Sequence, residues 1–206
     1  MKNRHQKPLI LRGHGQLPLP DGELTYVPGF FSRSVGDRLL SNLSATVLWS
    51  QPRITIFGRQ VHSPRLAAWY GDRESVYRYS GLTNQPLPWL SELLEIRHCV
   101  QQYVEGRFDG LLINLYRTGK DSMGWHSDDE KELGENPVIA SVSLGASRRF
   151  LLRHRRCSDL PVHEVNLEHG SLLVMRGATQ QNWRHSVPRM RNHDSPRLNL
   201  TFRQIN

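Results

Sequence analysis

The sequence has little cysteine, few aromatic residues and no long apolar run. Its 206 residues include two cysteines, Cys99 and Cys157, and neither belongs to a Cys-x-x-Cys pair. This excludes a disulfide framework and favours a reduced, intracellular compartment such as the cytoplasm. No stretch reaches the roughly 18 apolar residues of a membrane span, and the basic N-terminus lacks the apolar segment of a secretory signal. We therefore expect neither a membrane protein nor a secreted scaffold.

Acidic residues are also in deficit. The chain has 27 Lys and Arg against 19 Asp and Glu, which gives a net charge of +8 and a pI near 10.0. Most of this charge is arginine, whose planar guanidinium grips phosphate through paired hydrogen bonds. A basic protein also gains affinity for polyanions by releasing their counterions. Nucleic acid is therefore a candidate partner, although the same charge also serves solubility.

The chain divides into three parts that we expect to form one compact, monomeric unit. Residues 1–22 are polar and rich in proline and glycine, and they predict a flexible basic arm. Residues 23–105 mix helical and strand patterns, and residues 106–206 contain short apolar runs between turn residues. In the middle part the patterns predict strands over 24–27, 54–57, 66–70 and 76–79, and helices over 34–47 and 88–104.

The C-terminal part predicts an antiparallel β fold. Its apolar runs cover residues 111–116, 138–144, 150–152, 162–167, 171–175 and 198–202. Short strands at regular spacing are typical of a sandwich or barrel, with the jelly roll as the leading arrangement. We therefore expect a mainly β protein with flanking helices, in which an N-terminal helix-and-strand elaboration lies against a jelly-roll core.

A His-x-Asp pair, His126 and Asp128, is the strongest candidate for a metal site. In an extended segment both side chains share one face, because strand side chains alternate with period two. His185, 59 residues after His126, is the best third ligand, since His154 and His163 lie among loop-like or exposed residues. Two histidines and one carboxylate form the facial triad of non-haem Fe(II) oxygenases. The alternative is a buried histidine that hydrogen bonds satisfy.

The segment 197–203 alternates polar and apolar residues. Arg197, Asn199, Thr201 and Arg203 share one face of the expected strand. Two arginines on one face repel each other unless an anion lies between them, and a dicarboxylate meets that need because arginine binds carboxylate with paired hydrogen bonds. Upstream, Asn114-Leu115-Tyr116 places two further polar side chains on one face, where they can bind the same ligand. A solvated strand face is the simpler alternative.

These motifs together resemble the AlkB family of Fe(II)/2-oxoglutarate-dependent nucleic-acid dealkylases. Asn-x-Tyr, His-x-Asp, a distant His and Arg-x-Asn-Leu-Thr-Phe-Arg occur in the family's order, and Val142–Gly145 and His169–Met175 also match. The resemblance covers roughly residues 50–206. The spacing from His185 to Arg197 and the segment from Ile56-Phe57-Gly58 to Tyr70-Gly71-Asp72 are most similar to the branch with animal duplex-DNA repair members.

The resemblance implies a double-stranded β-helix core. It also implies Fe(II) as the metal cofactor, with 2-oxoglutarate and O2 as cosubstrates. Iron ligation, and with it catalysis, falls to His126, Asp128 and His185. Arg197 is implied to hold the distal carboxylate of 2-oxoglutarate and Arg203 to contact its iron-chelating end, with the site completed by Asn114, Tyr116 and Thr201. The implied reaction is oxidative demethylation of 1-methyladenine and 3-methylcytosine in DNA or RNA, which places the protein in the nucleoid or nucleus if DNA is the substrate.

Substrate contacts are expected in two places, within residues 23–105 and directly after Asp128. The resemblance implies that residues 23–105 are an N-terminal extension with a nucleotide-recognition lid. Ile56, Phe57 and Gly58 match an apolar finger that is wedged into the base stack, and Tyr77 and Tyr79 match a lid that stacks on a flipped base. Trp69 belongs either to the same wall around the flipped base or to the core, and a core position is also the alternative for Phe57. Asp129 and Glu130 are expected to attract a cationic base, and the alternative is a solvated acidic turn. Plausible phosphate contacts are Arg53, Arg59, Arg65 and the run 153–156.

Two other functions remain open from the sequence. A 2-oxoglutarate oxygenase acting on protein or a small molecule needs the metal and cosubstrate residues but neither a basic face nor a finger. A non-enzymatic nucleic-acid-binding module that keeps the fold needs no triad. Nothing in the sequence reads a 2′-hydroxyl, so DNA and RNA are not distinguished.

Overall fold

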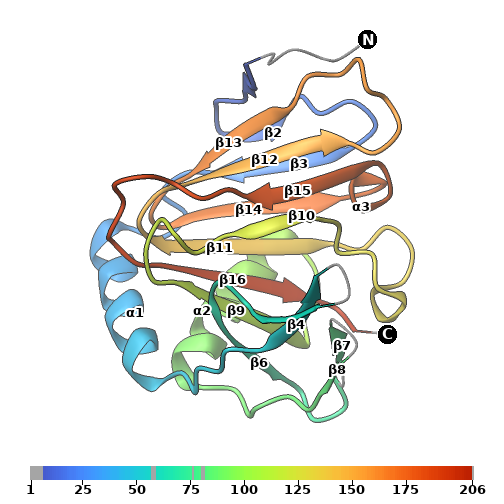
Figure 1. The fold of residues 1–206 in the computed structure, drawn as a ribbon. Coiled ribbons are helices and arrows are strands. Elements are labelled where there is room, and N and C mark those ends of the chain that lie inside the picture. The colour runs from blue at the N-terminus through green and yellow to red at the C-terminus, as the bar shows by residue number, and fades with distance from the viewer. Residues whose placement is uncertain (1–6, 57–58, 76, 80–81, 206) are drawn as a thin grey trace.

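The computed structural model describes residues 7–56, 59–75, 77–79 and 82–205 as a sandwich of two β-sheets with helices on one side (Figure 1). The larger sheet has seven strands in the order β2-β3-β14-β11-β16-β9-β6, and the smaller has five in the order β1-β13-β12-β15-β10. Two hairpins, β4–β5 and β7–β8, complete the strands. Of the described helices, none is long and apolar enough to cross a membrane.

The larger sheet consists of β2 (Gly15–Leu17), β3 (Glu23–Val27), β6 (Leu66–Gly71), β9 (Gly110–Tyr116), β11 (Ile139–Gly145), β14 (Ser171–Arg176) and β16 (Arg197–Arg203). The smaller sheet consists of β1 (Leu9–Ile10), β10 (Met123–His126), β12 (Arg148–His154), β13 (His163–Leu167) and β15 (Trp183–Val187). The hairpin strands are β4 (Arg53–Ile56), β5 (Arg59–His62), β7 (Tyr77–Tyr79) and β8 (Leu82–Asn84). The helices are α1 (Arg33–Thr46), α2 (Ser91–Val104), α3 (Thr179–Asn182) and the 3-10 turn η1 (Lys131–Leu133).

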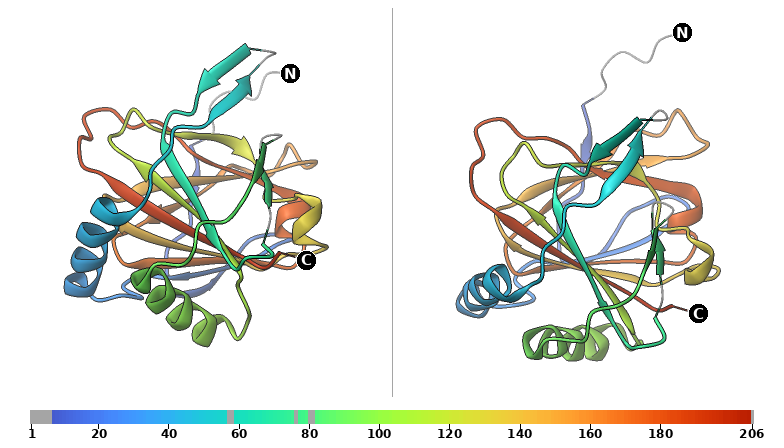
Figure 2. Two further views of the ribbon diagram at one scale, coloured as in Figure 1. Left: turned by 90° about the horizontal axis from the view of Figure 1, so that it is seen from below. Right: turned by 60° about the horizontal axis from the view of Figure 1, so that its bottom comes forward.

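The alternation of side chains along the larger sheet builds two hydrophobic cores. Leu111 and Ile113 of β9 and Leu200 of β16 pack on the side of helices α1 and α2. Leu112 and Tyr116 of β9 face the other way, into the core between the sheets. Figure 2 shows both helices on one face of the sandwich. The polar face of β16 therefore points into the space between the two sheets, which is where a jelly roll places its site.

Sequence patterns locate most of the long elements, and the mainly β jelly-roll fold is confirmed. The helix expected from Pro88 begins at Ser91, because the residues before it lie extended against β6. Leu87 donates its N–H to the Trp69 carbonyl at 2.9 Å and accepts from Gly71 at 3.1 Å. The strands β5, β8, β10 and β15 carry no apolar run and were not predicted.

The expected loose arm differs from the structure over its described part. β1 pairs in parallel with β13, and β2 pairs with β3. Leu11, Leu17 and Leu19 are buried, so the apolar residues between the prolines and glycines anchor this segment. The histidines expected in loops also lie elsewhere, since His163 is buried in β13 and His154 ends β12 with a largely buried side chain.

Candidate metal and cosubstrate site

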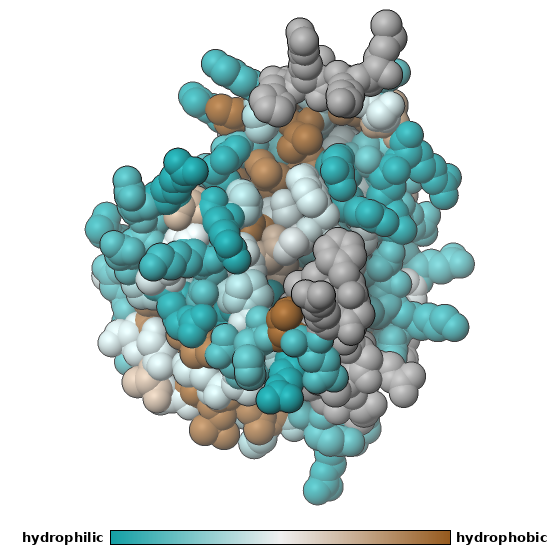
Figure 3. Space-filling model, viewed as in Figure 1, coloured by the Kyte–Doolittle hydropathy of each residue, from teal (hydrophilic) through white to brown (hydrophobic). Residues whose placement is uncertain are grey.

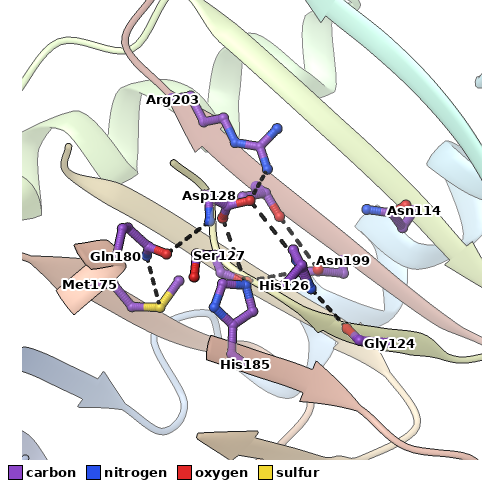
Figure 4. A network of polar contacts seen from close by, with 12 residues as sticks. Asn114, Gly124, His126, Ser127, Asp128, Met175, Gln180, His185, Asn199 and Arg203 are labelled. Atoms are coloured by element: carbon purple, nitrogen blue, oxygen red, sulfur yellow. Dashed lines mark hydrogen bonds and ion pairs between the residues drawn. The ribbon is translucent and has the colours of Figure 1, made fainter. Parts of the chain in front are cut away.

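Three side chains predicted to bind a metal lie together between the two sheets (Figure 4). His126 ends β10 and lies opposite His185 of β15 in the strand register, and Asp128 follows two residues later. Asp128 Oδ1 is 4.0 Å from His126 Nε2, and Asp128 Oδ2 is 3.9 Å from His185 Nε2. One ligand atom from each residue lies within 4.8 Å of the others. Two imidazoles and one carboxylate at this spacing suit Fe(II) with open coordination positions.

The two imidazoles are held by their surroundings. His126 Nδ1 lies 2.9 Å from the Gly124 carbonyl oxygen, so the Nδ1–H donates there and the Nε2 lone pair faces the other ligands. His185 stacks on Phe150, with ring centroids 5.1 Å apart. The His126 and His185 rings meet edge to face at 4.2 Å. These contacts fix the ring orientations that a shared metal requires.

Asp128 is held from two sides. Its backbone N–H donates to Gln180 Oε1 at 2.9 Å, and its Oδ1 accepts from Arg203 Nη2 at 2.6 Å. The Gln180 amide in turn lies 3.3 Å from Met175 Sδ through its Nε2. A buried carboxylate with one oxygen on arginine keeps its other oxygen directed toward His185.

The charges of the triad match the forms that bind a metal. Burial, together with the neighbouring His126, lowers the pKa of His185 to about 3. Burial also lowers the pKa of His126. Although burial opposes it, the charge of Arg203 and of the two histidines brings the pKa of Asp128 down to about 2. At neutral pH the site therefore presents two neutral imidazoles and one carboxylate, the deprotonated ligands that metal binding needs.

A cavity beside the triad collects most of the predicted cosubstrate residues. It is lined by Leu112, Asn114, Tyr116, Met123, His126, Asp128, Ser141, Phe150, Met175, His185, Val187, Asn199, Thr201 and Arg203. β16 and β9 supply its polar wall, where Asn199 pairs with Asn114 in the register. The strand alternation that suggested one polar face is thus realised as a single cavity wall.

Arg197 lies against the Tyr116 ring, with its guanidinium carbon 5.2 Å from the ring centroid. It is 1% exposed, and its Nη2 donates to Ser143 Oγ at 2.9 Å. Within the part of the chain that the structure describes, its Nε and Nη1 have no hydrogen-bond partner. Burial lowers the pKa of Arg197 to about 10. A buried guanidinium with two such donors is costly unless an anion accepts from them, which a carboxylate of 2-oxoglutarate can do.

The comparisons with known proteins agree with this geometry. The family model of the 2OG-Fe(II) oxygenase superfamily matches residues 23–203. The chain belongs to this superfamily. It is 41% identical to human alpha-ketoglutarate-dependent dioxygenase alkB homolog 3 over 86% of this chain and 64% of the relative. It is 39% identical to human DNA oxidative demethylase ALKBH2 over 85% of this chain and 70% of the relative. Within the superfamily it therefore belongs to the AlkB family.

The chain spans slightly less than two thirds of the alkB homolog 3 relatives, at 64% of the bovine protein. Among solved structures, that of OsALKBH1 superposes with a TM-score of 0.59 at 22% identity, covering 88% of this chain and 97% of that chain. A 2OG-Fe(II) oxygenase family oxidoreductase from Burkholderia pseudomallei gives the same TM-score at 14% identity, covering 88% and 84%. At these identities the structural likeness concerns the fold alone.

The residues expected to contact substrate are spread over the molecule. Ile56 is the last residue of β4, and β7 begins at Tyr77 and ends at Tyr79. Both strands belong to hairpins that are separate from the two large sheets. Phe57 and Gly58 lie outside the described residues. Trp69 is 6% exposed in the core between the sheets, and its Nε1 donates to the Ser75 carbonyl at 3.1 Å. It packs as a core residue, which was one of its two interpretations.

Two acidic residues, Asp129 and Glu130, directly follow the candidate metal ligand Asp128. Asp129 is exposed and accepts from Arg155 Nη1 at 2.7 Å, and Glu130 is half-buried before η1. Asp129 is thus an ion-pair partner of Arg155 in this structure. A cationic base that meets Asp129 must compete with this arginine.

Arg65 is misplaced by the sequence interpretation. It was expected on the surface as a phosphate contact, but it is 4% exposed and its Nε donates to Asn114 Oδ1 at 2.7 Å. The structure therefore makes Arg65 a neighbour of the cosubstrate wall. The preceding Ser63-Pro64 turn carries its side chain inward, and a single sequence offers no signal for that.

Sequence reasoning also missed Gln180, Ser143 and Arg148. Gln180 holds Asp128, and Ser143 holds Arg197. Arg148 is 1% exposed and donates to the carbonyls of Asp121 and Pro188, each at 2.8 Å. Gln180 and Ser143 are neutral residues without a distinctive spacing, and Arg148 is one arginine among many, so tertiary contact alone identifies them.

Proposed function

We propose that this protein removes alkyl groups oxidatively from N-alkylated bases of DNA, with 1-methyladenine and 3-methylcytosine as substrates. The observation that carries the proposal is the His126–Asp128–His185 triad in a cavity whose wall residue Tyr116 packs against the buried Arg197. Among the described residues, two donors of this arginine have no hydrogen-bond partner. This site lies in a chain similar to an alkB homolog 3 dioxygenase and to DNA oxidative demethylases named ALKBH2. A DNA substrate places the protein with the nucleoid or nucleus.

Separate sets of side chains would hold the metal ion and the cosubstrate. His126, Asp128 and His185 would hold Fe(II), and Arg203 keeps Asp128 charged and oriented. Arg197 would bind the far carboxylate of 2-oxoglutarate, with Asn114, Tyr116 and Thr201 along the same wall. Bound Fe(II), with O2 and 2-oxoglutarate, supplies hydroxylation of the N-alkyl carbon with release of succinate, CO2, an aldehyde and the unmodified base.

The cavity keeps water from the reacting atoms. Leu112, Phe150, Met175 and Val187 give it apolar walls. Asp128 and His185 are buried there, and His126 is half-buried. Low access of water strengthens the contact of Arg197 with a carboxylate. Since such a cavity cannot admit a stacked base, the target base must leave the helix, which costs least for bases methylated on the pairing edge.

Mass spectrometry of methylated oligonucleotides tests the proposal. Single- and double-stranded DNA and single-stranded RNA, each with one 1-methyladenine or 3-methylcytosine, are incubated with protein, Fe(II), ascorbate and 2-oxoglutarate. We expect wild type to remove one methyl mass from the DNA and His126→Ala to remove none. The matched control is His98→Ala, which changes an exposed histidine on α2 and leaves turnover intact.

Each other outcome has a definite meaning. Methyl groups that persist while 2-oxoglutarate is consumed would contradict the nucleobase substrate and favour a protein or small-molecule oxygenase. If metal-loaded wild type neither removes methyl groups nor consumes 2-oxoglutarate, the assignment as an enzyme is contradicted and a binding module is favoured. Faster loss from RNA than from DNA would move the substrate assignment to RNA.

A further inference from the structure

The outer face of the smaller sheet carries arginines that face each other. Arg153 of β12 pairs with Arg184 of β15 in the strand register, and both side chains are exposed. The preceding pair, Leu152 and His185, is buried toward the metal site, so the arginine pair points away from it. Like charges directly opposite each other on neighbouring strands are destabilising, and this arrangement favours an anion between them.

The surrounding groove has an excess of positive charge. Its lining includes Arg153, Arg155, Arg156 and Arg184, with Asp129 as its one acid. Asp129 pairs with Arg155 at 2.7 Å. Among the described residues, the other three arginines have no carboxylate within 4.0 Å. Figure 3 shows hydrophilic side chains gathered along the right-hand side of the molecule, where β12 ends and β15 begins.

The backbone that presents these arginines is anchored. His154 Nδ1 accepts from the Cys157 N–H at 2.8 Å, and its side chain is 6% exposed. The Arg155 N–H donates to the Asn182 carbonyl at 2.7 Å, and Arg155 Nη1 lies 3.3 Å from the Gln180 carbonyl. Arg153 and Arg184 therefore extend from paired strands and Arg155 from an anchored turn, which lowers the entropy cost of binding an anion.

An aromatic side chain borders this face. Trp125 of β10 is 36% exposed, and the Arg153 guanidinium carbon lies 4.6 Å from its ring centroid. Trp125 immediately precedes the metal ligand His126, just as Asp129 immediately follows the ligand Asp128. The strands β12, β15 and β10 are neighbours in the sheet. Their residues Arg153, Arg184 and Trp125 therefore lie close to the segment that carries His126.

We propose that Trp125, Arg153 and Arg184 form a second contact for single-stranded nucleic acid, outside the site that takes the target base. Arg153 and Arg184 hold a backbone phosphate between them, and an unpaired base beside that phosphate stacks on Trp125. Aromatic faces next to guanidinium groups are a sequence-independent way to bind single strands. The inference rests on the proposed nucleic-acid substrate and extends it to a flanking segment.

Fluorescence anisotropy with an unmodified single-stranded DNA oligonucleotide tests this contact with the full chain. For Arg153→Gln/Arg184→Gln we expect the Kd to rise roughly ten-fold and the slope of log Kd against log salt to fall by about 0.7 for each phosphate lost. For Trp125→Leu we expect binding of the single strand to weaken roughly five-fold or more, and binding of the matching duplex to change less.

The matched control is Arg149→Gln. Arg149 lies on the same strand and face but pairs with Glu164 at 2.7 Å, so its loss removes one positive charge, half of what the double variant removes, without touching the proposed contact. The proposal is overturned if the double variant keeps the wild-type Kd and salt slope, or if Arg149→Gln weakens binding as much. Equal binding of poly-glutamate by wild type at the same salt would also overturn it, because an acidic polypeptide would then serve as well.

The assay separates this proposal from the dealkylation itself. It uses unmodified DNA and no turnover, so it can succeed when no methyl group is removed. Conversely, wild type that demethylates oligonucleotides, with a double variant that binds them as tightly, would leave the enzyme assignment standing and remove only the second contact.

Discussion

At the scale of single residues, the site contains a buried polar side chain that destabilises the fold unless a ligand binds it. Arg197 is 1% exposed with two unused donors, and such a group opposes folding until an anion arrives. Gln180 has the opposite character, because its buried amide satisfies the N–H of Asp128 at 2.9 Å.

Replacing Arg197 by methionine separates stability from cosubstrate binding. We expect the variant to lose most of its affinity for 2-oxoglutarate and to be as stable as wild type or more stable without it, because a desolvated charge is removed. Calorimetric titration with 2-oxoglutarate and urea unfolding measure the two effects. Loss of several kcal/mol of stability with unchanged affinity would instead make Arg197 a structural residue.

Replacing Gln180 by leucine leaves the Asp128 N–H buried without a partner. We expect a loss of about 1–3 kcal/mol in the free energy of unfolding and weaker binding of Co(II), followed by its visible absorption. The matched variant is Gln181→Leu, which changes an exposed neighbour whose amide contacts Asn136. Equal metal affinity in both variants would show that Gln180 does not position the ligand.

At this scale the sequence identifies the residues with distinctive chemistry and spacing. His126 with Asp128, and the polar face of 197–203, are recognisable because polar groups recur at period two. His185 is recognisable only as the best of the remaining histidines. Arg65 and Gln180 are not, since one had a plausible surface role and the other has no pattern. Their positions follow from chain segments that meet only in the folded molecule.

At the scale of elements, β16 has one face for folding and the other for the site. Leu198, Leu200 and Phe202 are buried against the helices, while Asn199, Thr201 and Arg203 line the cavity. Apolar alternation therefore predicts both the strand and its polar face. It does not predict β10 and β15, because the core residues of these strands, such as Trp183 and Val187, are separated by polar side chains and form no apolar run.

Two substitutions on neighbouring residues of β16 test this division. Leu200→Ala leaves a cavity in the helix-side core, and we expect it to cost about 2–5 kcal/mol of stability with the Michaelis constant for 2-oxoglutarate unchanged. For Thr201→Ala we expect the reverse, a raised Michaelis constant and a small stability change. Urea unfolding and initial rates measure both, and equal effects of the two variants would contradict a two-sided strand.

At the scale of the whole molecule, the pairing of β10 with β15 in the smaller sheet brings His126 and His185, 59 positions apart, into one register pair. The smaller sheet thus carries two of the three proposed metal ligands, and the larger sheet carries the wall proposed for the cosubstrate. A ligand that binds both sheets should therefore stabilise the entire sandwich.

Metal binding provides a measure of that coupling. With Mn(II) as an inert probe at 100 times its Kd, we expect the free energy of unfolding of wild type to rise by about 2.7 kcal/mol. His126→Ala should show little of this gain, and His98→Ala should show all of it. Thermal unfolding with and without Mn(II) gives the comparison, and an equal gain in all three proteins would place the metal elsewhere.

The most direct measurement counts succinate and repaired base in one reaction. An oligonucleotide with a single 1-methyladenine is incubated with Fe(II), O2 and limiting 2-oxoglutarate, and both products are quantified by mass spectrometry. We expect one succinate for each methyl group removed, and neither succinate nor repaired base from His126→Ala. Succinate without loss of the methyl group would contradict the assignment of a nucleobase substrate.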